Sequence, residues 1–170
     1  MQVDFLAGEY GGTGKSRRTQ KALDMQPRKV RGCDLAFQIE PTTVSVKGKL
    51  PDGATDEVQV QVASVVPFLI MKGMALEDRR KAKDAYDIYF VLHNYPGGVE
   101  AVVKAFKPHL KLALVKEGLK NIGGKFATLD HVGPKDVSEF DETLDAEEHT
   151  IRQRDAFEKV NFLLQQLGIA

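Results

Sequence analysis

Charged residues recur at helical spacing between positions 71 and 90 of this chain. Lys72, Arg79, Lys83 and Asp87 follow one another at intervals of seven, four and four residues. On a continuous helix this spacing places them on one stripe. Arg79 and Lys83 are like charges four residues apart, and such a pair costs about 0.2–0.5 kcal/mol in an isolated helix. Because the sequence keeps these like charges despite their repulsion, the stripe could present cations to an anion. It could also be a solvated face with one ion pair between Lys83 and Asp87.

The order of residues in this segment resembles the motif of a known family. The pattern Lys-x-x-Ala-Leu-x-x-Arg-x-x-x-Lys-Asp-x-x-Asp runs from Lys72 to Asp87 and includes Arg79, Lys83 and Asp84. It is similar to the C-terminal motif of the AbiEii/AbiGii toxin family of nucleotidyltransferases. The resemblance implies that Lys72 binds the triphosphate of a nucleoside triphosphate. It also implies that Arg79 and Lys83 add positive charge there or pair with the two aspartates.

The two aspartates of the motif have two interpretations. Under the family resemblance, Asp84 and Asp87 shape the nucleotide site. Under a purely structural interpretation, they form an internal network of ion pairs that fixes the junction between two helices. The spacing of the residues does not distinguish these interpretations, which both remain open.

Asp4 lies within the short apolar segment Val-Asp-Phe-Leu near the start of the chain. A carboxylate in an apolar strand costs free energy unless it is paired, hydrogen-bonded or bound to a metal, although an edge-strand aspartate facing water avoids the cost. The family resemblance implies that Asp4 is a magnesium ligand. It would be the third carboxylate of a catalytic cluster whose other two members form an Asp-x-Asp pair. The implied catalytic residues are therefore Asp4 and Lys72, with Mg²⁺ as cofactor.

The family's Gly-Ser motif and its Asp-x-Asp pair are absent from this sequence and would precede Met1. The resemblance therefore implies a truncated nucleotidyltransferase. We expect the chain alone to be weak or inactive in magnesium-dependent nucleotidyl transfer, unless a separately encoded half complements it. The alternative is a non-catalytic, toxin–antitoxin-related interaction module. Its incomplete sheet would leave an exposed edge for a partner protein or a second copy.

A glycine-rich segment supports a third interpretation. Residues 11–16 read Gly-Gly-Thr-Gly-Lys-Ser, which is similar to the phosphate-binding loop of P-loop NTPases. That loop requires a glycine five residues before its Gly-Lys pair, where this chain has Glu9, and Gly8 stands one residue too early. The segment can therefore be a P-loop, a basic loop near an anionic ligand, or a plain surface loop.

The apolar pattern predicts an α+β fold, with a small mixed or antiparallel sheet of nucleotidyltransferase type followed by a helical bundle. We expect strands over residues 3–6, 33–39, 43–50 and 58–62, and helices over residues 66–79, 81–93, 99–106, 110–121 and 147–167, with residues 15–25 a short helix or a connection. The strands at 43–50 and 58–62 should form a hairpin, because Pro51-Asp-Gly supplies turn residues. Gly123-Gly and Gly133-Pro should bracket an irregular segment. Residues 1–64 would then be a partial sheet and residues 65–170 a helical region, together one compact unit.

The amino-acid composition limits which binding partners and which cellular compartment we expect for this chain. The chain has 24 basic and 24 acidic residues, so its formal net charge is zero, which argues against a broad nucleic-acid surface. Cys33 is the only cysteine, so no intramolecular disulfide can form, and we expect it to be a small buried hydrophobe. No apolar run approaches the roughly 20 residues needed to span a membrane. We therefore expect a cytoplasmic protein with no membrane partner.

Overall fold

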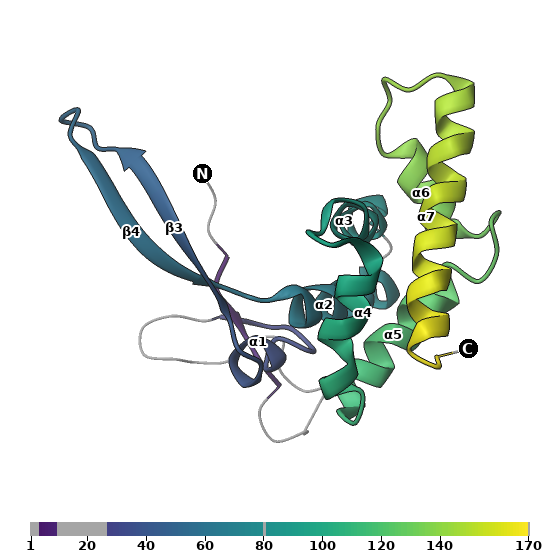
Figure 1. Ribbon diagram of the computed structural model, residues 1–170, viewed down its shortest axis with the longest axis horizontal. Coiled ribbons are helices and arrows are strands. Elements are labelled where there is room, and N and C mark those ends of the chain that lie inside the picture. The colour runs from purple at the N-terminus through teal and green to yellow at the C-terminus, as the bar shows by residue number, and fades with distance from the viewer. Residues whose placement is uncertain (1–3, 10–26, 80, 170) are drawn as a thin grey trace.

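The computed structural model describes residues 4–9, 27–79 and 81–169. Within these residues, two small two-stranded sheets are followed by a bundle of α-helices, and the architecture is mixed α+β but mostly helical (Figure 1). The α+β expectation is confirmed at this level. The glycine-rich segment at 11–16 and the possible helix at 15–25 lie outside the described residues. No described helix is both long enough and apolar enough to cross a membrane.

The first sheet is a minimal parallel pair near the start of the chain. β1 (Leu6–Ala7) pairs with β2 (Arg28–Lys29). The expected strand at 3–6 therefore begins later than predicted within the described residues. Two-residue strands contribute few hydrogen bonds of their own, so the position of this sheet depends on its side-chain contacts.

The second sheet is an antiparallel ribbon that projects from the helices (Figure 1). β3 (Thr42–Lys49) and β4 (Thr55–Val62) pair over their full length, and every residue of both strands is exposed. At the tip, Gly53 adopts a φ of 85°, which glycine tolerates without steric cost, and the Leu50 N–H donates to the Ala54 carbonyl over 2.8 Å. The expected hairpin is confirmed, and the turn forms where Pro51-Asp-Gly predicted it.

The strand expected over residues 33–39 is wrong. This segment contains a turn and the short helix α1 (Leu35–Gln38). In a strand, Leu35, Phe37 and Ile39 would lie on one face. In the helix, Leu35 and Ile39 are buried one turn apart, while Phe37 between them is 83% exposed. A short apolar run fits both the two-residue period of a strand and the 3.6-residue period of a helix, so the sequence pattern alone does not distinguish a strand from a helix here. Cys33 is buried and unpaired, as expected.

The helical bundle contains most of the buried hydrophobic residues. Its elements are α2 (Val65–Arg79), α3 (Ala82–Asn94), α4 (Gly98–Phe106), the 3₁₀ turn η2 (Lys107–His109), α5 (Ala113–Lys125), α6 (Val132–Glu139) and α7 (Ala146–Gln166). The expected helices at 66–79, 81–93, 99–106 and 147–167 are confirmed to within about two residues, which is the usual uncertainty of helix ends. α2 packs on α5 and α3, while α7 packs on α6, α4, α3 and α5.

An irregular segment does lie between Gly123-Gly and Gly133-Pro, as expected, but it is shorter than predicted because the glycines themselves belong to helices. Gly123 and Gly124 belong to α5, which begins and ends later than the helix expected at 110–121, and Gly133 with Pro134 begins α6. The irregular segment is therefore limited to residues 126–131. Gly133 serves close packing, because a Cβ atom there would lie 2.6 Å from the carbonyl oxygen of Lys125.

α2 and α5 approach closely through glycine. A Cβ atom on Gly73 would lie 2.5 Å from the carbonyl oxygen of Gly118, and one on Gly118 would lie 2.8 Å from Cγ2 of Ile70. Both distances are shorter than van der Waals contact. The two glycines therefore permit a helix contact on which the position of α2 depends.

We expect Gly73→Ala to lower the free energy of unfolding by about 1–3 kcal/mol, because the added methyl group overpacks the α2–α5 contact. Gly124→Ala is the matched control, since a Cβ atom there meets nothing within 4 Å. That change should be neutral or stabilising by up to about 1 kcal/mol, through helix propensity. Chemical denaturation followed by circular dichroism measures both effects, and equal effects would contradict the proposed close contact.

Candidate functional site

The charged residues of the sequence motif converge where α2 meets α3. Asp84, in the first turn of α3, is 1% exposed. Its carboxylate accepts hydrogen bonds from Nε and Nη2 of Arg79, each over 2.8 Å, and from Nζ of Lys72 over 3.1 Å. A bidentate arginine and a lysine thus compensate one buried carboxylate, and such charge-assisted hydrogen bonds are the stronger kind.

A second aspartate extends this cluster toward solvent. Nζ of Lys72 lies 2.5 Å from Asp87, and Nζ of Lys83 lies 2.8 Å from the same carboxylate. Nζ of Lys72 also lies 5.7 Å from the ring centroid of Phe68, within reach of a cation–π interaction. We call these five charged residues the α2–α3 charge network: Lys72, Arg79, Lys83, Asp84 and Asp87.

The network does not lie on one continuous helix. α2 ends at Arg79, and Lys81 has an extended backbone before α3 begins at Ala82. The chain therefore turns between the cations of α2 and the carboxylates of α3. Arg79, at the C-terminal end of α2, also interacts favourably with the partial negative charge of that helix end. The motif spacing identified the correct residues, while the fold brings them together across a helix junction.

Hydrogen bonding decides the charge state of the network. Burial raises the pKa of Asp84, but the hydrogen bonds and positive charges of Arg79 and Lys72 outweigh burial and hold it below the usual value for aspartate. The hydrogen bond with Asp84 correspondingly raises the pKa of Arg79. Asp84 is therefore ionised and Arg79 is cationic at neutral pH.

Asp4 precedes β1 and is exposed, whereas Lys72 lies on α2. Over residues 4–9, 27–79 and 81–169, no three histidine, cysteine, aspartate or glutamate side chains are grouped so as to hold a metal ion. Magnesium requires several oxygen ligands. The described residues therefore do not form a complete magnesium site by themselves, and the role of Asp4 as a metal ligand stays a prediction from the family resemblance.

Contacts around β1 form an anchor that no local sequence pattern predicts. The Asp34 carboxylate accepts a hydrogen bond from the Glu9 N–H over 3.1 Å and occupies the position where Gly8 would carry a Cβ atom. Arg31 pairs with Glu9 over 2.8 Å and with Glu117 of α5 over 2.6 Å. These contacts join the start of the chain to the helical bundle.

A second polar cluster joins α3 to α7. The Tyr89 hydroxyl donates to Asp155 over 3.0 Å, Nδ1 of His93 lies 3.0 Å from the same carboxylate, and Lys159 pairs with Asp155 as well. Burial, together with the hydrogen bond to Asp155, raises the pKa of Tyr89 to about 12. His93, Asp155 and Lys159 also line a hollow of about 430 Å³ beside α4 and α7. The cluster connects α3 and α7 directly, and this structural role accounts for the polar side chains in it.

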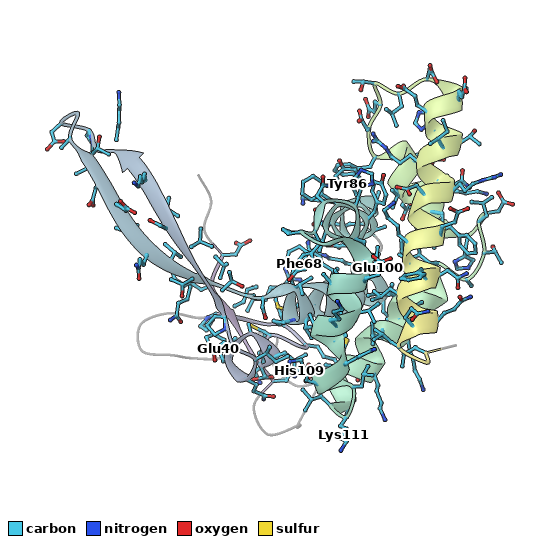
Figure 2. All side chains as sticks on the ribbon, viewed as in Figure 1. Glu40, Phe68, Tyr86, Glu100, His109 and Lys111 are labelled. Atoms are coloured by element: carbon cyan, nitrogen blue, oxygen red, sulfur yellow. The ribbon has the colours of Figure 1, made fainter. Side chains whose placement is uncertain are left out.

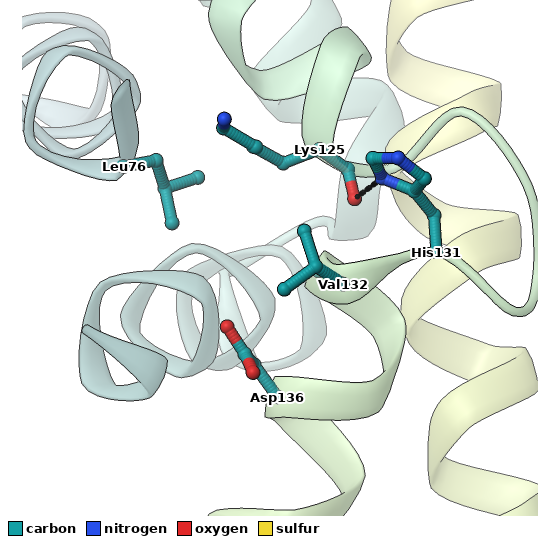
Figure 3. A pocket seen from close by; sticks show the side chains of 6 residues that line it. Leu76, Lys125, His131, Val132 and Asp136 are labelled. Carbon is teal, nitrogen blue, oxygen red and sulfur yellow. Dashed lines mark hydrogen bonds between the residues drawn. The ribbon is translucent and has the colours of Figure 1, made fainter. Parts of the chain in front are cut away.

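A smaller pocket lies between α2, α5 and α6 (Figure 3). Its volume is about 310 Å³, and its lining residues are Leu76, Lys125, His131, Val132, Gly133 and Asp136. Nδ1 of His131 donates to the Lys125 carbonyl over 2.8 Å. Burial and the nearby charge of Glu139 raise the pKa of Asp136. No residue of the charge network lines this pocket, so it is a separate feature of the bundle.

Comparisons with protein-family models, with curated proteins and with solved structures found no match to this chain. Functional inference therefore depends on the side chains and on the motif itself. Of the site residues predicted from the sequence, the structure brings together Lys72, Arg79, Lys83, Asp84 and Asp87. Asp4 is placed outside the two helices that carry them.

We expect Asp84→Asn to lower the free energy of unfolding by about 2–3 kcal/mol. Removing one partner of a fully buried ion pair costs about 3–5 kcal/mol, and here the 41% exposure of the Arg79 side chain lets water hydrate the released guanidinium. Asp78→Asn on α2 is the control, because Asp78 is exposed and its loss should change stability by less than about 0.5 kcal/mol.

The stability difference between wild type and Asp84→Asn should depend on pH in one direction. The pKa of Asp84 is lower in the folded chain than in the unfolded chain. The ionised carboxylate therefore contributes fully to the free energy of unfolding above the unfolded pKa of about 3.9, and this contribution is lost as the pH falls through the folded pKa. Urea unfolding at several pH values should show a constant difference from about pH 5 to about pH 8, which narrows below about pH 4. A difference that grows on acidification would contradict the ionised pair.

Tyr89 should stay protonated at about pH 11, above the ordinary tyrosine pKa of about 10. An absorbance titration of the folded protein should show a phenolate step near pH 12 that disappears in Tyr89→Phe. Tyr95→Phe serves as the control and should leave this step in place. Circular dichroism at each pH confirms that the chain is still folded. A step that survives Tyr89→Phe would show that burial beside Asp155 is not its cause.

Proposed function

We propose that this chain binds the phosphates of a nucleoside triphosphate at the α2–α3 charge network. One observation carries the proposal: exposure increases from the carboxylates to the cations. The side chains of Asp84 and Asp87 are 1% and 17% exposed, whereas those of Lys72, Arg79 and Lys83 are 19%, 41% and 64% exposed. The network therefore has negative charge at its base and positive charge toward solvent.

The charge balance of the network also favours an anion. Three cations face two carboxylates, which leaves one excess positive charge. The nearby acidic residue Glu77 pairs with Lys125 of α5 over 2.9 Å, which compensates its charge. A phosphate that approaches from solvent would meet the ammonium and guanidinium groups before it meets the carboxylates.

Phosphate binding requires only a modest rearrangement. The Lys83–Asp87 pair is an exposed i,i+4 pair, and such pairs contribute roughly 0.3–0.5 kcal/mol, so Lys83 can turn toward a ligand at small cost. Lys72 is held in place by two carboxylates and serves as a positioned point charge. Arg79 retains its bidentate contact with Asp84 while its exposed side adds positive potential.

The resemblance of the motif to the AbiEii/AbiGii nucleotidyltransferases supports a nucleotide as the source of this phosphate. We propose this chain as the phosphate-binding part of a nucleotidyltransferase-like protein. Because the described residues gather no carboxylate cluster, nucleotidyl transfer would need acidic residues from elsewhere. Asp4 would join these further acidic residues as a metal ligand, on the family resemblance alone.

Isothermal titration calorimetry with each of the four ribonucleoside triphosphates tests this proposal. We expect wild-type binding at micromolar concentration, a loss of at least about tenfold in affinity in Lys72→Gln, and a smaller loss in Lys83→Gln, because each removes one charged contact to phosphate. Lys111→Gln is the matched control. Lys111 is also exposed, and Figure 2 places it at the lower end of the helical region, away from Tyr86 of α3.

Three results would reject this site. Absence of heat with every triphosphate would remove the nucleotide-binding function from this chain. Equal losses in Lys72→Gln and Lys111→Gln would show non-specific charge attraction. Loss of binding in Lys15→Ala, but not in Lys72→Gln, would transfer the function to the glycine-rich segment. Thermal unfolding of each variant separates lost binding from lost folding.

A further inference from the structure

One face of the β3–β4 ribbon is apolar and exposed. The register pairs Val44 with Val60 and Val46 with Val58, and Val62 follows on the same face. We call these five residues the valine face. Each of them is 39–49% exposed, and the outer end of the ribbon extends well beyond the helices (Figures 1 and 2).

The opposite face of the ribbon is polar. The alternate positions carry hydroxyl, amide and charged side chains, among them Ser45 opposite Gln59 and Lys47 opposite Glu57, which also form an ion pair over 3.1 Å. Alternation of this kind is typical of a sheet with one buried and one solvated face. The ribbon therefore has the sequence of a sheet that is covered on one side only.

The described N-terminal part has few buried contacts of its own. Among residues 4–9 and 27–64, only Cys33, Leu35 and Ile39 belong to the buried hydrophobic set, whereas residues 65–167 contribute all its other members. An isolated two-stranded ribbon is at best marginally stable in water. Its exposed valines thus require a covering surface that the described residues do not provide.

We propose that a second copy of this chain covers the valine face, so that two ribbons pack face to face in a symmetric dimer. This inference concerns the ribbon and goes beyond nucleotide binding at α2 and α3. A two-fold axis brings the same surface of each copy together, and the valine face is suited to this because it is uniform. Two ribbons that stack at about 10 Å interdigitate side chains of this size.

The distribution of charged residues permits two valine faces to pack against each other. On the valine face of the two strands, Asp56 is the one charged residue, and it lies beyond Val58 toward the tip, opposite Gly48. The valines therefore meet without burying a charge. The whole chain has zero formal net charge, so two copies approach without long-range repulsion. The polar outer faces then limit the assembly to two copies.

The size of the valine face sets the expected strength of the dimer. It exposes on the order of a few hundred Å² of apolar surface per copy, the size at which patches mark interaction sites. Two such faces bury a total below roughly 1,200 Å², the lower limit for stable specific interfaces, so the contact between two copies is weak. The dimer should therefore dissociate on dilution.

Sedimentation equilibrium of the full chain, over about 1 to about 200 µM, tests the assignment. We expect the mass to rise from 18.8 kDa toward twice that value. Replacing Val44, Val46, Val58 and Val60 by threonine keeps the shape and strand preference of the side chains but adds hydroxyl groups. This variant should raise the dimer dissociation constant at least about tenfold, since burying unpaired hydroxyls is unfavourable.

The matched control is the triple replacement of Ser45, Gln59 and Gln61 by threonine on the polar face. It should dimerise like wild type, and circular dichroism should show unchanged helix content in both variants. A chain that is monomeric at every concentration overturns the proposal, whatever other protein binds the ribbon. Equal dimerisation of the valine-face variant and wild type overturns it as well. Nucleotide titration of the same samples reports separately on the charge network.

Discussion

The structure depends most on the buried carboxylate of Asp84. A charge at 1% exposure costs several kcal/mol unless it is compensated, and Arg79 and Lys72 supply that compensation from α2. The same contacts fix the angle at which the chain turns from α2 into α3. Since α2 also packs on α5 through Gly73, the position of a large part of the bundle follows from this one ionic contact and one close helix approach.

The network shows why a structural and a functional interpretation of the same residues are compatible. Asp84 and Arg79 satisfy each other, and their role in stability needs no ligand. Lys72 bridges Asp84 and Asp87, whereas Lys83, whose side chain is 64% exposed, pairs with Asp87. Stability therefore resides in the contacts of Asp84, and Lys83 retains the freedom to turn toward an anion. A variant at Lys83 separates the two roles.

Elements with a long and regular hydrophobic pattern were predicted from the sequence. Features that depend on contacts between residues far apart in the chain were not. The helices α2, α3, α4 and α7 and the β3–β4 hairpin have clear patterns and were predicted. Short or glycine-containing segments were not, because Leu35 and Ile39 fit both a strand and a helix turn, and Gly133 marks close packing instead of a break. The motif identified all five residues of the charge network, and the structural interpretation of Asp84 and Asp87 anticipated ion pairs at the junction of two helices. The contact of Asp34 with Gly8 joins residues 26 positions apart and leaves no local pattern.

The two proposed sites differ in what supports them physically. The charge network lies on helices with a shared hydrophobic core, so its geometry is set before any ligand arrives. The valine face lies on a ribbon with no core of its own, so its order depends on what covers it. Rigid elements suit a site that must position charges within a few tenths of an ångström. A marginal ribbon suits association, because packing against a second layer supplies the burial that the ribbon lacks. Under the two proposals, the N-terminal part would serve assembly and the helical part anion recognition.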